Sequence, residues 1–170
     1  PLCLAVILGL GACQAGAQSR AKRAPEAPAP VSADDAFVQA RNAAARTDGP
    51  RFEAAAANTA GHPLSEYIDY WRLRLGLPRT SAGAPPSDGS ADADVRRFID
   101  RPPGSLVADL LRRDWLLDLG QRGDWSTFDE QYAQWILRDD TSVHCRSWQG
   151  AALRGRPLPA EAIETLFQAR

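Results

Sequence analysis

The segment 103–148 constrains the fold most, because it reads as consecutive amphipathic helices. Its first part, 105–122, carries two apolar stripes instead of one. Their members are Leu106, Leu110 and Leu117, and Leu111, Trp115 and Leu119. A helix with two apolar stripes is covered by neighbours from two directions. Gly123 is expected to end this helix, and Asp124 is expected to cap the next one through its side-chain oxygen.

The next helix is expected to bury a single stripe at helical spacing. Its members are Trp125, Phe128, Tyr132, Trp135 and Ile136. A third helix is expected after the Asp-Asp-Thr-Ser run, with Cys145, Trp148 and Ala152 on its buried side. The first and second of these helices are joined by almost no loop, at Gly123 and Asp124, and are therefore expected to pack as an antiparallel hairpin. The segment therefore predicts a stack of helix hairpins.

Further helices are expected in the remainder of the folded region, which we place at 32–170, and they bring the total to seven or eight. They begin after Ser32 or Asp34, span 51–59, 64–76 and 92–101, and start again at Ala160. Their inward residues are Ala36, Phe37, Ala40, Ala44, Phe52, Leu64, Tyr67, Ile68, Trp71, Leu75, Val95, Phe98, Ile99, Ile163, Leu166 and Phe167. Residues 78–91 lack apolar periodicity and predict a mobile loop. The predicted fold class is all-α, a curved superhelical stack of antiparallel helix pairs (an α-solenoid) of which this chain is the N-terminal fragment.

Residues 1–17 are interpreted as part of a secretory signal peptide, because their apolar run is too short to span a bilayer. Cleavage would follow Ala17, or the run would end as a lipobox at Cys13, which would then carry a lipid. A buried N-terminal helix is the alternative. The Pro/Ala-rich segment 18–31 predicts an extended linker. We therefore expect an exported protein, either periplasmic or anchored in the outer membrane through Cys13.

The composition is that of an ordinary soluble domain, with 44% hydrophobic residues, 24% charged residues and a net charge of −1. This balance gives no electrostatic reason to expect nucleic acid as a partner. The sequence has no Gly-rich phosphate loop, no Ser/His/Asp arrangement and no Cys/His metal spacing. No cofactor, metal ligand or catalytic residue is therefore predicted.

Two groups of acidic residues resemble catalytic or binding sites. Asp114 and Asp118 lie four residues apart on the central helix, as a general acid and base would. The alternative is structural: Asp118 pairs with Arg122, and Asp114 meets a basic side chain of a neighbouring helix. Glu66 and Asp69 stand beside two tyrosines, which is compatible with a sugar-stacking surface or with core tyrosines flanked by solvated acids.

The two histidines and the remaining cysteine are expected to be structural. His62 stands in a turn, where a helix-end role is more common than metal binding. Cys145 is predicted to be a buried, inert thiol on the side of Trp148. His144 precedes it, but successive residues on a helix point about 100° apart and do not form a catalytic pair.

Several segments, taken in order, resemble the soluble lytic murein transglycosylases. The segments are His62-Pro63-Leu64-Ser65-Glu66-Tyr67-Ile68-Asp69-Tyr70; 95–99 with Pro103; 110–116; Gly123-Asp124-Trp125; and Val143-His144-Cys145-Arg146 with Gly155. The resemblance runs from about residue 32 to residue 170. The loop at 78–91 departs from the family in length and composition.

This resemblance implies an exported bacterial enzyme that cleaves the MurNAc–GlcNAc bond of peptidoglycan and leaves a 1,6-anhydro sugar. In that family a superhelix precedes a lysozyme-like catalytic domain, whose acid is the Glu of a Glu-Ser pair. None of the six Glu residues of this chain precedes a Ser. The chain is therefore expected to be the non-catalytic front part, inactive alone and acting on glycan strands within the whole protein. The alternative is a free-standing helical scaffold or lipoprotein that binds protein partners in the envelope.

Overall fold

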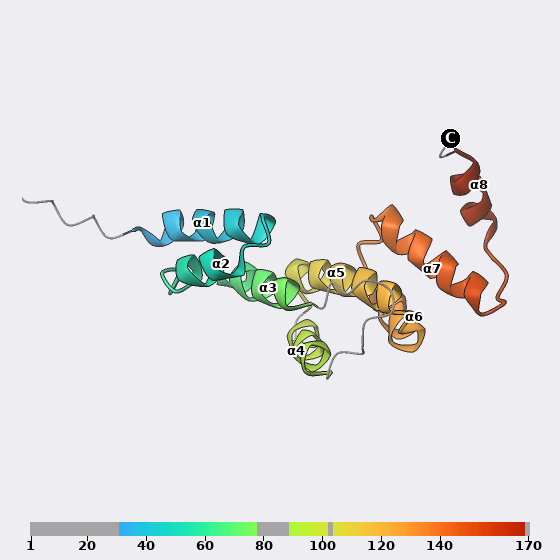
Figure 1. Cartoon of the computed structure of the whole chain (residues 1–170), viewed down its shortest axis with the longest axis horizontal. Helices are drawn as coiled ribbons and strands as arrows, with labels where there is room; N and C mark the ends of the chain where they lie inside the picture. The colour runs from blue at the N-terminus through green and yellow to red at the C-terminus, as the bar shows by residue number, and fades with distance from the viewer. Residues whose placement is uncertain (1–30, 78–88, 102–103, 169–170) are drawn as a thin grey trace, which may run out of the picture. The chain divides into compact units, whose positions relative to one another are not determined.

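The computed structural model describes residues 31–77, 89–101 and 104–168, without the side chains of 165–168. All regular structure in these ranges is helical, in eight helices (Figure 1), so the predicted all-α class is confirmed. The predicted signal peptide, Cys13 and the linker as far as residue 30 lie outside the described residues. Within the described ranges, no helix combines the length and apolar character that a membrane span requires.

The first two helices, α1 (Ala33–Ala45) and α2 (Gly49–Ala56), pack side by side through alanine (Figure 1). Of the two caps predicted for α1, Ser32 and Asp34, the structure uses Ser32, whose Oγ accepts the Asp35 backbone N–H at 3.0 Å. The α2 helix begins two residues earlier than predicted. Asp48 caps it, and the following Pro50 suits a first helical turn, where no backbone donor is needed.

The helices α3 (Ser65–Gly76) and α4 (Ser90–Ile99) carry the next part of the core. The residues that α4 buries are Val95, Phe98 and Ile99, as predicted. The α3 helix buries Ile68, Tyr70 and Trp71. Leu64 was predicted on the same stripe, which is wrong: it precedes α3 and is exposed. The α4 helix starts inside the predicted loop, after Gly89 in a left-handed conformation with φ +77°, and 78–88 lie outside the described residues.

The long helix α5 (Leu106–Arg122) is covered from several directions, as its two stripes predict, because it contacts α3, α4, α6 and α7. Its fully buried apolar residues are Leu111, Trp115, Leu116 and Leu119. Ser105 caps its first turn, and Gly123 ends it with φ +80°. The prediction for Leu106 is wrong, since its side chain is 57% exposed at the start of the helix.

The helix α6 (Trp125–Gln134) ends before the apolar stripe does. Asp124 caps it as predicted, by accepting the Thr127 backbone N–H at 3.2 Å. Trp135 is buried in extended backbone, whereas Ile136 is 83% exposed, so its predicted place on the buried stripe is wrong. The chain leaves the helix here because the Asp109 carboxylate accepts the backbone N–H of Ile136, which a continuing helix would use internally.

The helix α7 (Thr141–Leu153) is turned differently from the prediction. Its buried residues are Val143 and Gly150, whereas Cys145 and Ala152 are exposed and Trp148 is partly exposed. The predicted buried thiol is therefore wrong. A Cβ at position 150 would stand 2.5 Å from a carbon of the Trp125 ring, so the glycine allows α7 to approach α6 closely. The α7 helix thus turns Val143 and Gly150, and not its largest apolar side chain, Trp148, towards the core.

The last helix, α8 (Ala160–Gln168), starts where the sequence predicts. Ala162 is fully buried, and Ile163, which was expected to face inward, is exposed. The other two predicted inward residues, Leu166 and Phe167, have side chains outside the described part of the chain.

Candidate functional site

The predicted carboxylate pair lines a groove of about 330 Å³ between α3 and α5. The residues that line the groove are Arg74, Leu77, Asp114, Leu117, Asp118 and Gln121. The structure thus brings both aspartates to one place, together with a cation from another helix. Their hydrogen bonds and their access to solvent decide what they can do chemically.

Asp114 is held by donors from two helices. Tyr70 of α3 donates its hydroxyl proton to Oδ2 at 2.7 Å, and Arg74 of the same helix lies 3.2 Å from that oxygen. Arg113 donates to Oδ1 at 3.0 Å. The prediction that a basic residue of a neighbouring helix meets Asp114 is confirmed. Burial and the charge of Asp114 raise the pKa of Tyr70, so the phenol stays a proton donor.

Asp118 forms the predicted pair with Arg122, whose Nε lies 2.8 Å from Oδ2. Burial of the carboxyl group raises the pKa of Asp118 to about 6, although the Arg122 charge acts in the opposite direction. Both carboxylate oxygens are shielded from solvent. Asp118 therefore has the pKa of a general acid without the access to a substrate that one needs.

Arg122 also binds Asp92 of α4, with Nη2 at 2.8 Å from Oδ1. The same Asp92 oxygen accepts the indole N–H of Trp115 at 2.8 Å. This cluster of Asp92, Trp115, Asp118 and Arg122 joins α4 to α5. Sequence analysis missed Asp92, because its partners are 23 and 30 residues away and no local spacing indicates them.

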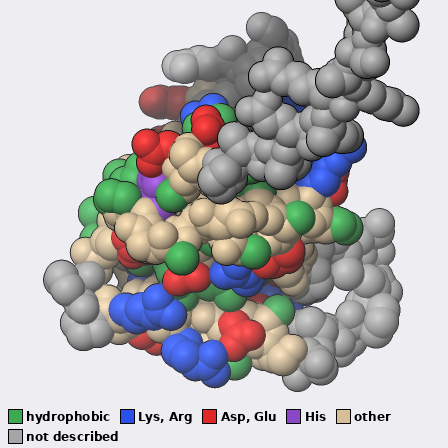
Figure 2. All heavy atoms as spheres, turned by 90° about the vertical axis from the view of Figure 1, so that its left-hand side faces the viewer, with side chains coloured by type: hydrophobic (Ala, Val, Ile, Leu, Met, Phe, Trp, Pro, Cys, Tyr) green, Lys and Arg blue, Asp and Glu red, His purple; other side chains and the backbone are tan. Residues whose placement is uncertain are grey.

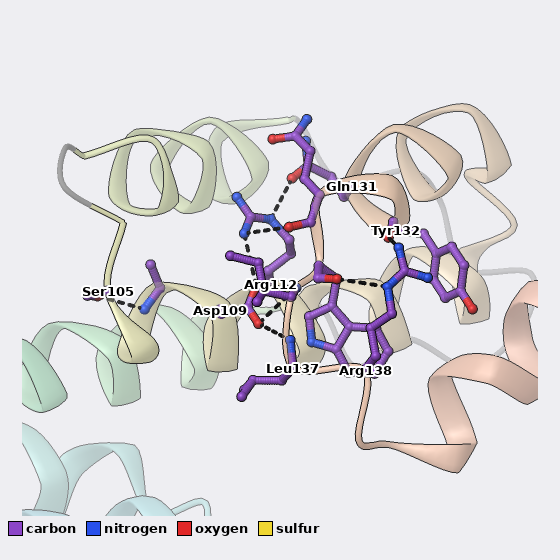
Figure 3. Close-up of polar contacts among 11 residues, drawn as sticks. Ser105, Asp109, Arg112, Gln131, Tyr132, Leu137 and Arg138 are labelled. Atoms are coloured by element: carbon purple, nitrogen blue, oxygen red, sulfur yellow. Dashed lines mark hydrogen bonds and ion pairs between the residues drawn. The ribbon is translucent and has the colours of Figure 1, made fainter.

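Asp109 is a second residue that sequence analysis missed. It is 4% exposed and accepts the backbone N–H groups of Ile136 at 3.1 Å and Leu137 at 2.7 Å. Arg112 donates to it from Nη1 at 3.1 Å (Figure 3). The spacing of Asp109 and Arg112 is a visible sequence signal, but the backbone groups that the carboxylate binds are not. The carboxylate thereby fixes the segment that follows α6.

Glu66 and Asp69 each contact another side chain of the protein, as residues with a structural role do. Ser105 donates its hydroxyl proton to Glu66 at 2.6 Å, and Asp69 lies 3.3 Å from Arg72. Tyr70 is buried, and Tyr67 packs on Trp71 with ring centres 5.8 Å apart. Of the two alternatives, this arrangement favours core tyrosines over a sugar-stacking surface, although the acids, expected to be solvated only, have side-chain partners.

The histidines are occupied by nearby groups. His62 stacks on Phe37 at 4.3 Å, and its Nδ1 accepts the Leu64 backbone N–H at 3.1 Å. His144 contacts the Arg138 carbonyl through Nε2 at 3.1 Å. A carbonyl only accepts, so Nε2 carries the proton and Nδ1 accepts the Tyr132 hydroxyl at 2.7 Å. Across the described ranges, no three His, Cys, Asp or Glu side chains gather as metal ligands would.

Charged side chains on the surface are paired across helices. Arg72 of α3 donates to Glu53 of α2 at 2.9 Å, and Arg96 of α4 donates to Glu130 of α6 at 3.2 Å. Figure 2 shows one face of the molecule, on which basic and acidic side chains lie interspersed. Pairs of this exposed kind each contribute about 0 to 1 kcal/mol, so the buried contacts of α5 dominate the polar energetics.

The chain was also compared with known proteins. Protein-family models, curated proteins and solved structures gave no match. The resemblance to lytic transglycosylases therefore rests on the five sequence segments quoted above.

Proposed function

We propose that this chain is the non-catalytic helical front part of a bacterial peptidoglycan lytic transglycosylase. The helix pairs form an α-solenoid that positions a glycan strand relative to an acid supplied by another domain. The observation that carries this proposal is the state of the candidate carboxylates. Asp114 and Asp118 are each bound by basic or hydroxyl side chains that hold helices together.

The chemistry of glycoside cleavage supports a positioning role. The reaction needs a carboxylic acid that reaches the leaving oxygen. Asp118 has a raised pKa, but its oxygens are shielded by the packing around α5. Asp114 lines the groove, but Tyr70, Arg74 and Arg113 already occupy its carboxylate oxygens. Neither group is arranged as a general acid.

The residues that carry the family resemblance have framework roles in this fold. Tyr70, at the end of the first of these segments, binds Asp114 and links α3 to α5. Gly123 and Asp124 together form the turn between α5 and α6. A helical framework common to the family would need residues in these roles. Their roles in this fold therefore support the proposed family at the level of architecture.

The proposed location is the bacterial envelope. Export depends on the predicted signal in residues 1–17, and anchoring depends on acylation of Cys13. Mass spectrometry of protein isolated from bacterial envelopes tests both. A diacylglyceryl group on Cys13 would support an outer-membrane anchor, and a mature chain starting at Gln18 would support a soluble periplasmic form. An unprocessed chain in the cytoplasm would contradict the proposal.

The activity test is the digestion of purified sacculi, with chromatography of the released products. We expect no anhydro-muropeptides from the 170-residue chain alone. Anhydro products that disappear in Asp114→Asn would show that the chemistry resides in this chain after all. The reading frame beyond Arg170 discriminates the two functions. A downstream Glu-Ser domain supports the transglycosylase, whereas a nearby stop codon favours the free-standing scaffold.

A further inference from the structure

A groove of about 370 Å³ lies beside the N-terminal half of α5 and the segment that follows α6. Its apolar lining includes Ile99, Ala108 and Leu137, and Leu106 and Ile136 also line it. These last two are 57% and 83% exposed and are among the most exposed large hydrophobic residues of the described chain. Both residues were predicted to be buried. In the structure they instead form an exposed apolar surface.

Ser105, Asp109, Arg112 and Gln134 are the polar residues that line the groove, and Arg112, the cation among them, is 8% exposed. Its Nε donates to Gln131 at 3.3 Å, and its Nη1 donates to Asp109 at 3.1 Å and to the Gln134 carbonyl at 3.5 Å. Its other terminal nitrogen, Nη2, makes no hydrogen bond with the residues that the structure describes (Figure 3). A guanidinium this buried normally has its donors satisfied, so the two N–H groups on Nη2 leave Arg112 able to bind a further acceptor.

The charges around the groove favour an anion as that acceptor. The nearest carboxylate, Asp109, already accepts two backbone N–H groups and Arg112 Nη1. The N-terminus of α5 lines the same groove through Gly104, the N-cap Ser105 and the first helical residue, Leu106. The N-terminus of a helix carries a partial positive charge. Asp109 lines the groove too and offsets part of this positive charge, so the groove combines an apolar surface with the unused Nη2 donors of Arg112 and the N-terminus of α5.

We propose that this groove binds the C-terminal residue of a partner peptide. An apolar side chain lies against Leu106 and Ile136, and the terminal carboxylate binds Arg112 through a charge-assisted hydrogen bond. A peptide fits better than a fatty acid, because the groove is open along Ile136 and would leave much of an acyl chain in water. Binding of this kind does not depend on the proposed role in peptidoglycan turnover.

The test is a titration of the 170-residue chain with acetyl-Ala-Ala-Leu, followed through the backbone amide resonances in NMR spectra. We expect shifts at Leu106, Ile136 and Leu137. The same peptide with an amidated C-terminus should bind about tenfold more weakly, which is the loss of one charge-assisted contact. Equal affinity for the two peptides would overturn the proposal, and so would tighter binding of decanoate than of the peptide.

Two variants at one exposed position separate charge from apolar contact. Ile136→Glu and Ile136→Lys both remove the apolar side chain and leave the backbone N–H that binds Asp109. Relative to Ile136→Lys, Ile136→Glu should bind the free peptide about tenfold more weakly, because its carboxylate repels that of the ligand. Leu153→Glu, at another exposed position, should leave affinity unchanged. If the two Ile136 variants bind equally, the positive groove plays no part and the proposal fails.

Discussion

Replacing Asp118 by Asn tests whether burial determines the charge state of this carboxyl group. Asn has nearly the same shape and carries no titratable proton. In the protein, Asp118 lies beside Arg122, which keeps its second partner, Asp92, in the variant. The substitution therefore removes one buried titration and leaves the cation paired.

The magnitude follows from the shift of the pKa of Asp118 from 3.8 to about 6. The folded state holds the proton in a pH range where the unfolded state has released it. The stabilisation is therefore fully present below pH 3.8 and is lost as the pH rises through about 6. A shift of about two pKa units corresponds to about 3 kcal/mol. Wild-type stability relative to Asp118→Asn should fall by up to this amount across the window.

The assay is urea unfolding followed by helical circular dichroism, at pH values from about 4 to about 7. The informative quantity is the difference in unfolding free energy between variant and wild type at each pH. Asp94→Asn is the matched control, because Asp94 is exposed and pairs only with the exposed Arg97 in the described contacts. A difference that does not change with pH for Asp118→Asn would refute the conclusion that burial outweighs pairing.

Three further predictions concern packing and buried hydrogen bonds, each measured by urea unfolding. Trp115→Ala should destabilise the fold by about 3–5 kcal/mol because the ring is fully buried, and a loss below about 1 kcal/mol would show that the buried face of α5 is misassigned. Asp109→Ala should cost about 3–5 kcal/mol, because it leaves the buried Arg112 charge and two backbone donors without their acceptor; an unchanged midpoint would mean that water replaces the carboxylate. Gly150→Ala should cost about 1–3 kcal/mol through overlap with the Trp125 ring, whereas Gly76→Ala, which meets open space in α3, should be neutral or stabilising; equal effects would contradict the close approach of α6 and α7.

Helix boundaries were predictable where a local contact sets them. Ser105 and Asp124 each bind a backbone N–H three residues ahead, and Gly123 adopts the left-handed conformation that ends α5. Each of these devices acts within one helical turn, so a residue type at one position indicates it. The end of α6 was not predictable, because the group that terminates the helix, Asp109, lies 27 residues earlier in the chain.

Helix faces were less predictable than helix ends. Apolar spacing identified the buried side of α4 correctly, but it favoured Cys145 and Trp148 over Val143 and Gly150 in α7. A hydrophobic scale gives a glycine no weight in such a pattern. In the fold, however, the missing side chain of Gly150 admits the Trp125 ring, and that contact depends on a partner from another helix.

The two carboxylates of the candidate site, Asp114 and Asp118, also differ in how far their partners could be predicted from local sequence. The pairing of Asp118 with Arg122 was predictable because both residues lie on one helix, one turn apart. For Asp114, only the class of partner was predictable. The identity of Tyr70 and Arg74 depends on how α3 packs against α5, which no spacing in the sequence determines.

The position of α5 among its neighbours explains why its polar residues differ in role along its length. Where α3, α4, α6 and α7 cover the helix, a carboxylate must be paired to be buried, and Asp109, Asp114 and Asp118 accordingly bind cations or backbone donors. At its first turn the cover is incomplete, and Leu106 remains exposed beside Ile136. Arg112 lies between these two regions, with three of its five N–H donors used internally and the two on Nη2 left over. In an all-helical fold of this kind, the sites open to a ligand are therefore expected where the central helix emerges from its neighbours and not at its midpoint.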